Sequence, residues 1–301
     1  LAFVAGGSAG VHVVDVSDPL SPTLVRTEAS SGATTRVALS DDVVYTAGSA
    51  LIALDAGTGD RLGVLSIANS GGSGRVTEVH ASGGLVYAVT DNDTLHVIDP
   101  VGSASGGGSP MVLGSVTIPT PPVRRVGFED FRVFVADNVA YVANGLEISQ
   151  VASSRPLERG GYLTFDVSNP TAPTLISNID TGDVQAGNIQ TVLNGSGLAL
   201  VAGGFRGIQL HRATDPQNTF DLLTEFPTSG RVTSVAIAAG IGFATSDAGR
   251  LHVVNYSPFD AQGQAPQVTI DTNAVDLDAD LPGIQVQEGT TVPIVADITD
   301  D

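Results

Sequence analysis

The stretch "GVHVVDVSDPLSPTLV", residues 10–25, decides the fold of this chain. It alternates apolar and polar residues up to Asp15, turns at Ser17-Asp18-Pro19, passes Pro22 and becomes apolar again. A period of two predicts a half-buried strand, and the Ser-Asp-Pro cluster predicts a turn. The stretch therefore encodes a strand, a turn and a second strand.

The same strand recurs along the chain. Its six copies are "GVHVVDVSDP" at 10, "ALIALDAGTG" at 50, "TLHVIDPVGS" at 94, "GYLTFDVSNP" at 161, "GIQLHRATDP" at 207 and "RLHVVNYSPF" at 250. The sixth position holds Asp15, Asp55, Asp99, Asp166, Arg212 and Asn255. An Asp or Asn at a strand end can accept a hydrogen bond from its own turn, which explains why this residue type recurs.

Each copy has the same neighbours: an inner strand and a short second strand before it, and an outer strand after it. Four strands that repeat every forty to fifty residues are typical of a propeller blade. We therefore predict an all-β fold, a six-bladed β-propeller of four-stranded antiparallel blades over residues 1–260, followed by a short C-terminal β segment. The first unit has no inner strand of its own, so a seven-bladed propeller is the alternative.

The composition narrows the class of protein further. The net charge is −19, from 25 Asp and 7 Glu against 13 basic residues that are all Arg, and Cys and Trp are absent. The sequence therefore has neither disulfides nor thiolate metal sites. Such an acidic chain repels nucleic acid and anionic membranes, so we expect neither as a partner. No apolar run is long enough to form a membrane-spanning helix.

Residues 10–25 and 161–176, "GYLTFDVSNPTAPTLI", resemble the LVIVD repeat, whose consensus is close to "GLxIVDVSDPxxPxLVG". The resemblance implies a β-propeller, an extracellular location on the cell surface or in a secreted protein, and a binding or structural role. It supplies no catalytic motif, so no site residue comes from it.

The pattern changes after about residue 260. We interpret 261–283 as an acidic linker, in which residues 266–272 are a candidate for the last outer strand of the propeller. Residues 284–301 predict two short strands around the Glu288-Gly289 turn and resemble the opening of a bacterial immunoglobulin-like or cadherin-like repeat.

Alternating carboxylates in this tail form a candidate Ca²⁺ site. The candidate ligands are Asp271, Asp276, Asp278 and Asp280. Ca²⁺ takes six to eight oxygens, and such a cation would stiffen the junction of two modules. The spacing is not that of an EF-hand. The alternative is a solvated acidic linker.

Four arginines precede or start predicted inner strands and are candidates for a ring at one mouth of the central channel. They are Arg36, Arg75, Arg125 and Arg231. Guanidinium groups placed in this way could bind a carboxylate or phosphate. The alternative is that each pairs with an Asp of a neighbouring blade or with a turn carbonyl. His12, His96 and His252 share one slot in three blades and are too far apart for one metal, so we interpret them as structural.

We therefore expect a non-catalytic binding or structural module of a large secreted or cell-surface protein, active in adhesion, matrix or surface-filament assembly. Its partners would be other surface proteins, copies of itself or polysaccharide. The alternative is a Ca²⁺-dependent propeller hydrolase or lactonase-like enzyme with its site over the channel. Among the predicted inner strands, Glu78 and His80 are the groups suited to such chemistry.

Overall fold

The computed structural model describes the greater part of the chain. The described residues are 1–30, 32–40, 42–67, 74–100, 110–119, 131–143, 162–177, 188–191, 196–219, 221–238 and 240–259, with the backbone alone at 267–272 and 294–299.

Six antiparallel sheets, here called blades 1 to 6, follow one another along the chain. Blade 1 contains β1 (Ala2–Ala5), β2 (Val11–Asp15) and β3 (Thr23–Glu28). Blade 2 contains β4 (Arg36–Ser40), β5 (Val43–Ala47), β6 (Leu51–Asp55) and β7 (Arg61–Leu65). Blade 3 contains β8 (Val76–Ser82), β9 (Leu85–Thr90), β10 (Thr94–Asp99) and β11 (Met111–Thr117).

The second half repeats this order. Blade 4 contains β12 (Arg132–Ala136), β13 (Val139–Ala143), β14 (Tyr162–Asp166) and β15 (Thr174–Leu175). Blade 5 contains β16 (Ile189–Thr191), β17 (Leu198–Ala202), β18 (Ile208–Arg212) and β19 (Leu222–Phe226). Blade 6 contains β20 (Val232–Ala238), β21 (Ile241–Ser246) and β22 (Arg250–Asn255), followed by a short 3-10 turn, η3 (Ser257–Phe259).

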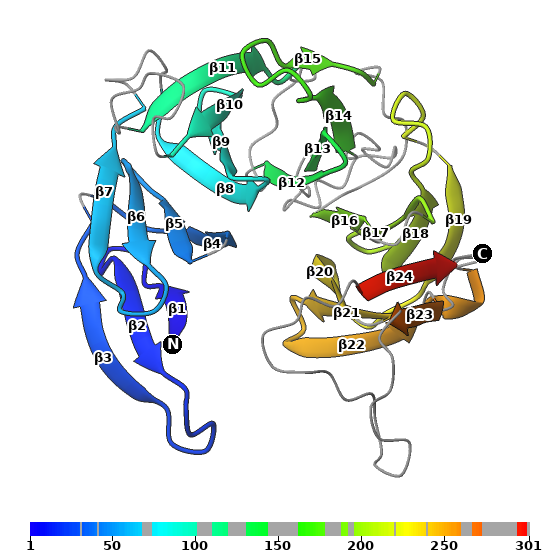
Figure 1. Ribbon diagram of the computed structural model, residues 1–301, viewed down its shortest axis with the longest axis horizontal. Helices are drawn as coiled ribbons and strands as arrows, with labels where there is room; N and C mark the ends of the chain where they lie inside the picture. The colour runs from blue at the N-terminus through cyan, green and yellow to red at the C-terminus, as the bar shows by residue number, and fades with distance from the viewer. Residues whose placement is uncertain are drawn as a thin grey trace, which may run out of the picture.

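The blades are arranged around one central axis, with blades 1 and 6 on either side of an opening in the ring (Figure 1). In each blade every strand pairs antiparallel with the next one in sequence. The prediction of an all-β, six-bladed propeller is confirmed, and six blades account for every sheet of three or more strands in the described residues. No helix in the part of the chain that the structure describes is long and apolar enough to cross a membrane.

The repeated motif has a local structural reason at its Asp. Asp15 Oδ1 accepts a hydrogen bond from the Ser17 amide at 2.9 Å, and Asp166 Oδ1 accepts one from the Ser168 amide at 2.9 Å. Asn255 makes the same bond to Ser257 at 3.0 Å. These Asx-turns end the strand of the repeated motif, as the sequence predicts, and in blades 1 and 4 the turn leads to the outer strand.

The third strand also carries a β-bulge at one fixed position. Its pairing with the outer strand shifts between the fourth and fifth residues of the motif in four blades. The shifts lie at Val13/Val14, Ala53/Leu54, Val97/Ile98 and Leu210/His211. A bulge increases the local twist of a strand pair. Its recurrence indicates that the outer edges of blades 1, 2, 3 and 5 are bent in the same way.

The core lies between the blades. For each blade we call the surface toward the next blade in the chain its forward face and the opposite surface its back face. Five apolar clusters lie at the five junctions, and each joins a forward face to the following back face. Their members from the two faces include Val11 with Leu54, Leu51 with Val86, Leu95 with Leu163, Tyr162 with Val201, and Leu210 with Val235. Each sheet is therefore stabilised by its neighbours, as expected for a repeat architecture.

The C-terminal segment differs from one sequence expectation. β23 (Gln267–Thr272) pairs antiparallel with β24 (Ile294–Thr299) in a separate two-stranded sheet. Residues 267–272 are therefore not the outer strand of blade 6, because their partner is β24 and not β22. The division at 260 and 283 and the immunoglobulin-like resemblance remain predictions, since residues 273–293 lie outside the described residues.

Candidate functional site

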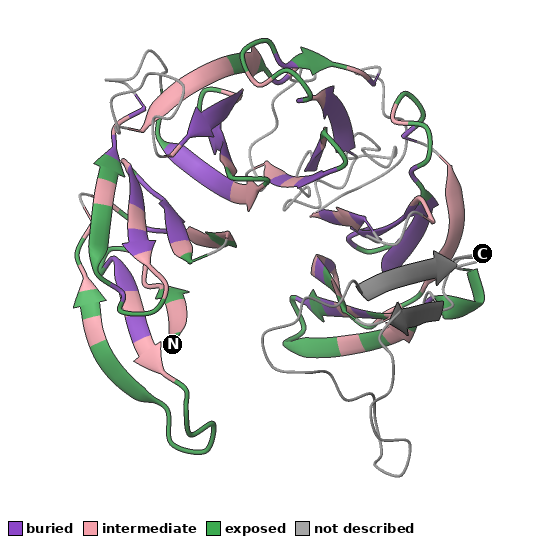
Figure 2. Ribbon diagram, in the orientation of Figure 1, coloured by how far each residue is buried: buried purple, intermediate pink, exposed green. Residues whose placement is uncertain are grey.

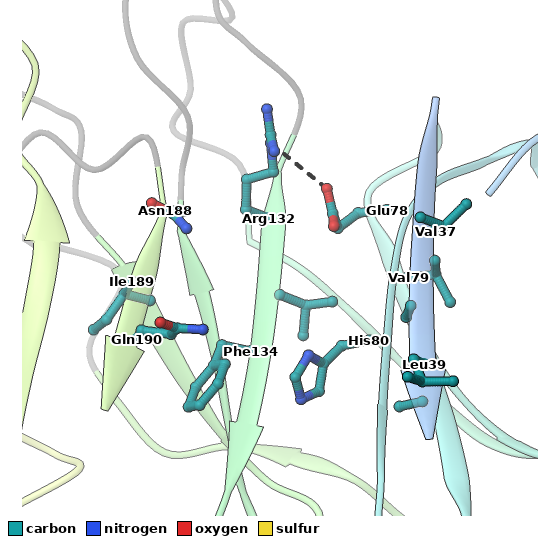
Figure 3. Close-up of a pocket in the computed structure, with 13 residues that line it drawn as sticks. Val37, Leu39, Glu78, Val79, His80, Arg132, Phe134, Asn188, Ile189 and Gln190 are labelled. Carbon is teal, nitrogen blue, oxygen red and sulfur yellow. Dashed lines mark ion pairs between the residues drawn. The ribbon is translucent and has the colours of Figure 1, made fainter. Parts of the chain in front are cut away.

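A cavity of about 310 Å³ lies among the inner strands of four blades. Its walls are β4, β8, β12 and the segment 188–190, which contribute Val37, Leu39, Glu78, His80, Arg132, Phe134, Asn188 and Gln190 among others (Figure 3). Inner strands converge on the axis of a propeller, and small-molecule sites favour such places. We therefore take this cavity as the candidate site.

Glu78 is the central charged group of the cavity. Its Oε2 lies 3.1 Å from Arg36 Nε in blade 2 and 3.5 Å from Arg132 Nε in blade 4. The Glu78 side chain is 10% exposed, and the two arginines are 33% and 24% exposed. A second bond orients Arg36, whose Nη1 donates to the Thr35 carbonyl at 2.8 Å. One carboxylate in blade 3 thus contacts guanidinium groups from both adjacent blades.

Burial raises the pKa of Glu78 from 4.5 to about 7, and the charges of Arg132 and Arg36 oppose this rise. Loss of hydration disfavours the ionised carboxylate more than the two cations favour it. Glu78 therefore changes its charge near neutral pH, in a cavity that also contains an imidazole.

His80 lies two residues further along β8 and packs against Phe134 of β12. The ring centroids are 5.0 Å apart and the planes are inclined by 57°. Burial lowers the pKa of His80, and a hydrogen bond with the backbone of Val135 works in the opposite direction. His80 is therefore a neutral, packed imidazole at neutral pH.

The two amides of the cavity bind the edge of the next blade. Asn188 Oδ1 accepts from the Val235 amide at 2.7 Å, and its Nδ2 donates to the Val235 carbonyl at 3.0 Å. Gln190 Oε1 accepts from the Ile237 amide at 2.7 Å. These side chains satisfy backbone groups of β20 and attach blade 6 to blade 5.

Two of the predicted arginines belong to a second kind of contact, near the turn between the second and third strands. The Arg75 amide donates to Asp91 Oδ1 at 2.9 Å, and the Arg231 amide donates to Asp247 Oδ1 at 2.8 Å. The side chains pair as well, with Nε to Oδ2 distances of 3.7 and 3.4 Å. Here the Asp holds the start of the inner strand within one blade.

The structure places Arg36, Arg75 and Arg231 at or beside the start of inner strands, each paired with a carboxylate. The partner of Arg36 is on a neighbouring blade, as in the alternative, but it is Glu78 and not an Asp. The partners of Arg75 and Arg231 are Asp residues of their own blades. Arg125 lies outside the described residues. The inner strand of blade 4 begins at Arg132, which takes the slot that we expected for Arg125. The sequence signal that identifies Arg132 is the Arg-Val pair, which opens other predicted inner strands and opens "RVFVAD" as well.

The candidate Ca²⁺ ligands are not brought together by the described part of the structure. Asp271 is on β23, for which only the backbone is described, and Asp276, Asp278 and Asp280 lie outside the described residues. Within the described ranges, no group of three or more His, Asp or Glu side chains could hold a metal ion.

The three equivalent histidines bond within their own blades. His12 Nδ1 lies 2.8 Å from Thr27 Oγ1, His96 Nδ1 lies 2.7 Å from Ser115 Oγ, and His252 Nε2 lies 3.3 Å from Ser246 Oγ. These contacts agree with a structural role for the shared slot.

Comparison with known proteins supports the fold. A model of the LVIVD repeat matches residues 1–27 and 157–181, the two regions where the sequence resembles that repeat most. Comparison with curated proteins by sequence found no match.

Two solved structures show the same architecture. The WD40 domain of Neurospora crassa Pan2 matches with a TM-score of 0.57 and 12% identity, over 84% of this chain and 73% of that one. A chain in a crystal structure of the mitotic checkpoint complex matches with a TM-score of 0.57 and 13% identity, over 82% of this chain and 68% of that one. At this identity the likeness concerns the fold alone.

Proposed function

We propose that this chain is a non-catalytic binding or structural module of a large secreted or cell-surface protein, active in adhesion, matrix or surface-filament assembly. The observation that carries the proposal is the use of the polar side chains in the central cavity. Glu78 pairs with arginines of two adjacent blades, and Asn188 and Gln190 bond the backbone of the next blade. Because these polar side chains join adjacent blades, they favour the function of a rigid scaffold that binds its partners through its surfaces.

Composition supports the same function. The net charge of −19 suits a protein that stays dissolved outside cells, and the absence of Cys makes its stability independent of the redox state of its surroundings. The match to LVIVD repeats in two segments supports a surface location by resemblance. The partners that fit are other surface proteins, further copies of this chain or polysaccharide. Ca²⁺ at Asp271 to Asp280 remains part of this proposal.

The location is tested on intact source cells with a broad-specificity protease. We expect the chain, followed by antibody, to be cleaved while a cytoplasmic control protein survives. A chain that survives on intact cells but is cleaved after lysis would contradict the proposed location.

One observation favours a second candidate function, a hydrolase acting over the channel. Glu78 has a pKa of about 7 and shares the cavity with His80, and a carboxyl group that titrates near neutrality can act as a general acid or base. A panel of esters, lactones and glycosides incubated with wild type and Glu78→Gln distinguishes the two functions. We expect no turnover above background. Turnover that Glu78→Gln abolishes, in a variant that still melts cooperatively, would establish the enzyme instead.

A further inference from the structure

The forward face of blade 6 has apolar residues in slots that are covered on the forward faces of other blades, although its described sheet ends at β22 without an outer strand. On β21 and β22, Phe243 lies opposite Val253 and Thr245 lies opposite Leu251, so these residues share one side of the sheet. In the repeat, Leu251 and Val253 take the slots of Ile208 and Leu210 in blade 5. Those two residues are fully buried, whereas Leu251 is 65% and Val253 is 58% exposed.

The back face of blade 1 is less completely uncovered, since His12 and Val14 are half-buried. His12 and Val14 take the slots of Ile52 and Leu54, which are buried in blade 2 against blade 1. Val4 lies opposite His12 on the same side of the sheet and is 49% exposed. Leu24, opposite Val14, is 61% exposed.

These two surfaces do not cover one another within the chain. Figure 2 shows exposed residues along β22 at one end of the ring and along β3 at the other. At all five junctions a forward face meets a back face, and in the described residues only blades 1 and 6 keep one such face uncovered. Monomeric proteins rarely expose such contiguous apolar surface without a binding role.

We propose that a second copy of this chain covers the forward face of blade 6 with the back face of its own blade 1. We choose this occupant because the same face-to-face contact occurs at five junctions in the chain, and the described residues leave one uncovered surface of each kind. The contact joins two different surfaces and is therefore heterologous, so copies add head to tail. The inference deepens the proposed function by naming the partner in assembly, and it rests on that function.

Charge predicts how this association responds to salt. Each copy carries a net charge of −19, so copies repel one another at low ionic strength. The residues proposed for the contact are mainly apolar: Val4, Val14, Phe243, Leu251 and Val253. Salt screens the repulsion without weakening apolar burial. Association therefore strengthens from low to high salt.

The first experiment is sedimentation velocity on residues 1–301 from low micromolar to submillimolar concentration. Wild type forms species larger than one chain, and more of them at high salt. Leu251→Asp with Val253→Asp removes the forward face, and Val4→Asp with Val14→Asp removes the back face. Each double variant associates at least about a hundredfold more weakly. Leu62→Asp, at an exposed leucine on β7, is the matched control and leaves association unchanged.

Mixing the two double variants tests the head-to-tail geometry. Each variant keeps the face that the other lacks, so an equimolar mixture forms a dimer and nothing larger. A symmetric contact between identical faces would give no such dimer. Circular dichroism and thermal melting show whether each variant has kept the fold.

Oxidative cross-linking gives a readout that avoids disruptive charges, because the chain has no native Cys. Val4→Cys combined with Val253→Cys forms a ladder of disulfide-linked chains. A fast-migrating, internally linked monomer would show that blade 1 covers blade 6 of the same chain and closes the ring. The absence of any linkage would exclude the proposed contact. Either result overturns the inference, as does a wild type that stays monomeric. Neither result bears on turnover or location, so the proposed function fails or survives separately.

Discussion

The tripeptide Leu-His-Val occurs in the same slot of two blades and has opposite environments there. On β10, Leu95 and Val97 are fully buried, because blade 4 covers them. On β22, Leu251 is 65% and Val253 is 58% exposed. The residues take equivalent slots of the repeat, but β10 pairs with the outer strand β11 and is covered by blade 4, whereas β22 is the edge strand of its sheet and has no covering blade in the described residues. In this fold a blade gains its stability from what lies against its faces.

The largest expected effect comes from removing the same side chain at the two positions. Leu95→Ala should lower the free energy of unfolding by about 3 kcal/mol, because it leaves a cavity in the junction between blades 3 and 4. Leu251→Ala should cost less than about 0.5 kcal/mol in the monomer, because its side chain is already hydrated. Urea unfolding monitored by circular dichroism measures both. Equal losses would show that the two faces are not covered differently.

The second prediction concerns the inner strands at the axis, where the charge of the buried Glu78 side chain depends on pH. Burial raises the pKa of Glu78 from 4.5 to about 7, so the folded chain holds this proton more tightly than the unfolded chain. Between those pH values the Glu78 contribution to stability therefore falls as pH rises, by on the order of 3 kcal/mol in total. Above pH 7 it no longer changes.

Glu78→Gln isolates this contribution, because the neutral amide cannot ionise. The histidines act in the opposite direction: burial lowers the pKa of His211 from 6.5 to about 4, which makes stability rise with pH over that range. Melting temperatures of wild type and variant should diverge from pH 4.5 to 7, with the variant gaining relative to wild type. A constant difference across that range would mean that Glu78 stays ionised in the fold.

A smaller effect is expected at the exposed Asp contacts. Asp247→Ala removes the acceptor that holds the Arg231 amide and should cost about 1 kcal/mol. Asp247→Asn keeps an acceptor oxygen and loses only the ion pair, in which the Asp247 side chain is 46% exposed and the Nε to Oδ2 distance is 3.4 Å, so it should cost about 0.5 kcal/mol or less. Chemical denaturation distinguishes them. Equal losses for the two variants would assign the stability to the ion pair.

Much of the fold could be predicted from the sequence because its determinants are local. The alternation around Val13 and the Asx-turn at Asp15 recur with one period, and both depend only on adjacent residues. The cavity was harder to predict. Glu78 and His80 could be assigned to an inner strand, but Asn188 and Gln190 gain their roles from the backbone edge of a different blade.

The other points at which the structure differs from the sequence prediction also depend on contacts with distant parts of the chain. "LHV" at 95 and 251 gives no signal of which copy is covered, since burial depends on the neighbouring sheet. Residues 267–272 have the pattern of a blade strand, yet β23 pairs with β24. Strand pattern predicts that a segment forms a strand, and it does not choose between two available partners.

Amide hydrogen exchange on the monomeric chain tests the central claim most directly, namely that adjacent blades stabilise one another through their faces. We predict the strongest protection in β9, β10, β13 and β17, which are covered on both faces, and the weakest in β1 and β22 at the ends of the ring. Equal protection of β10 and β22 in a chain shown to be monomeric would contradict the account.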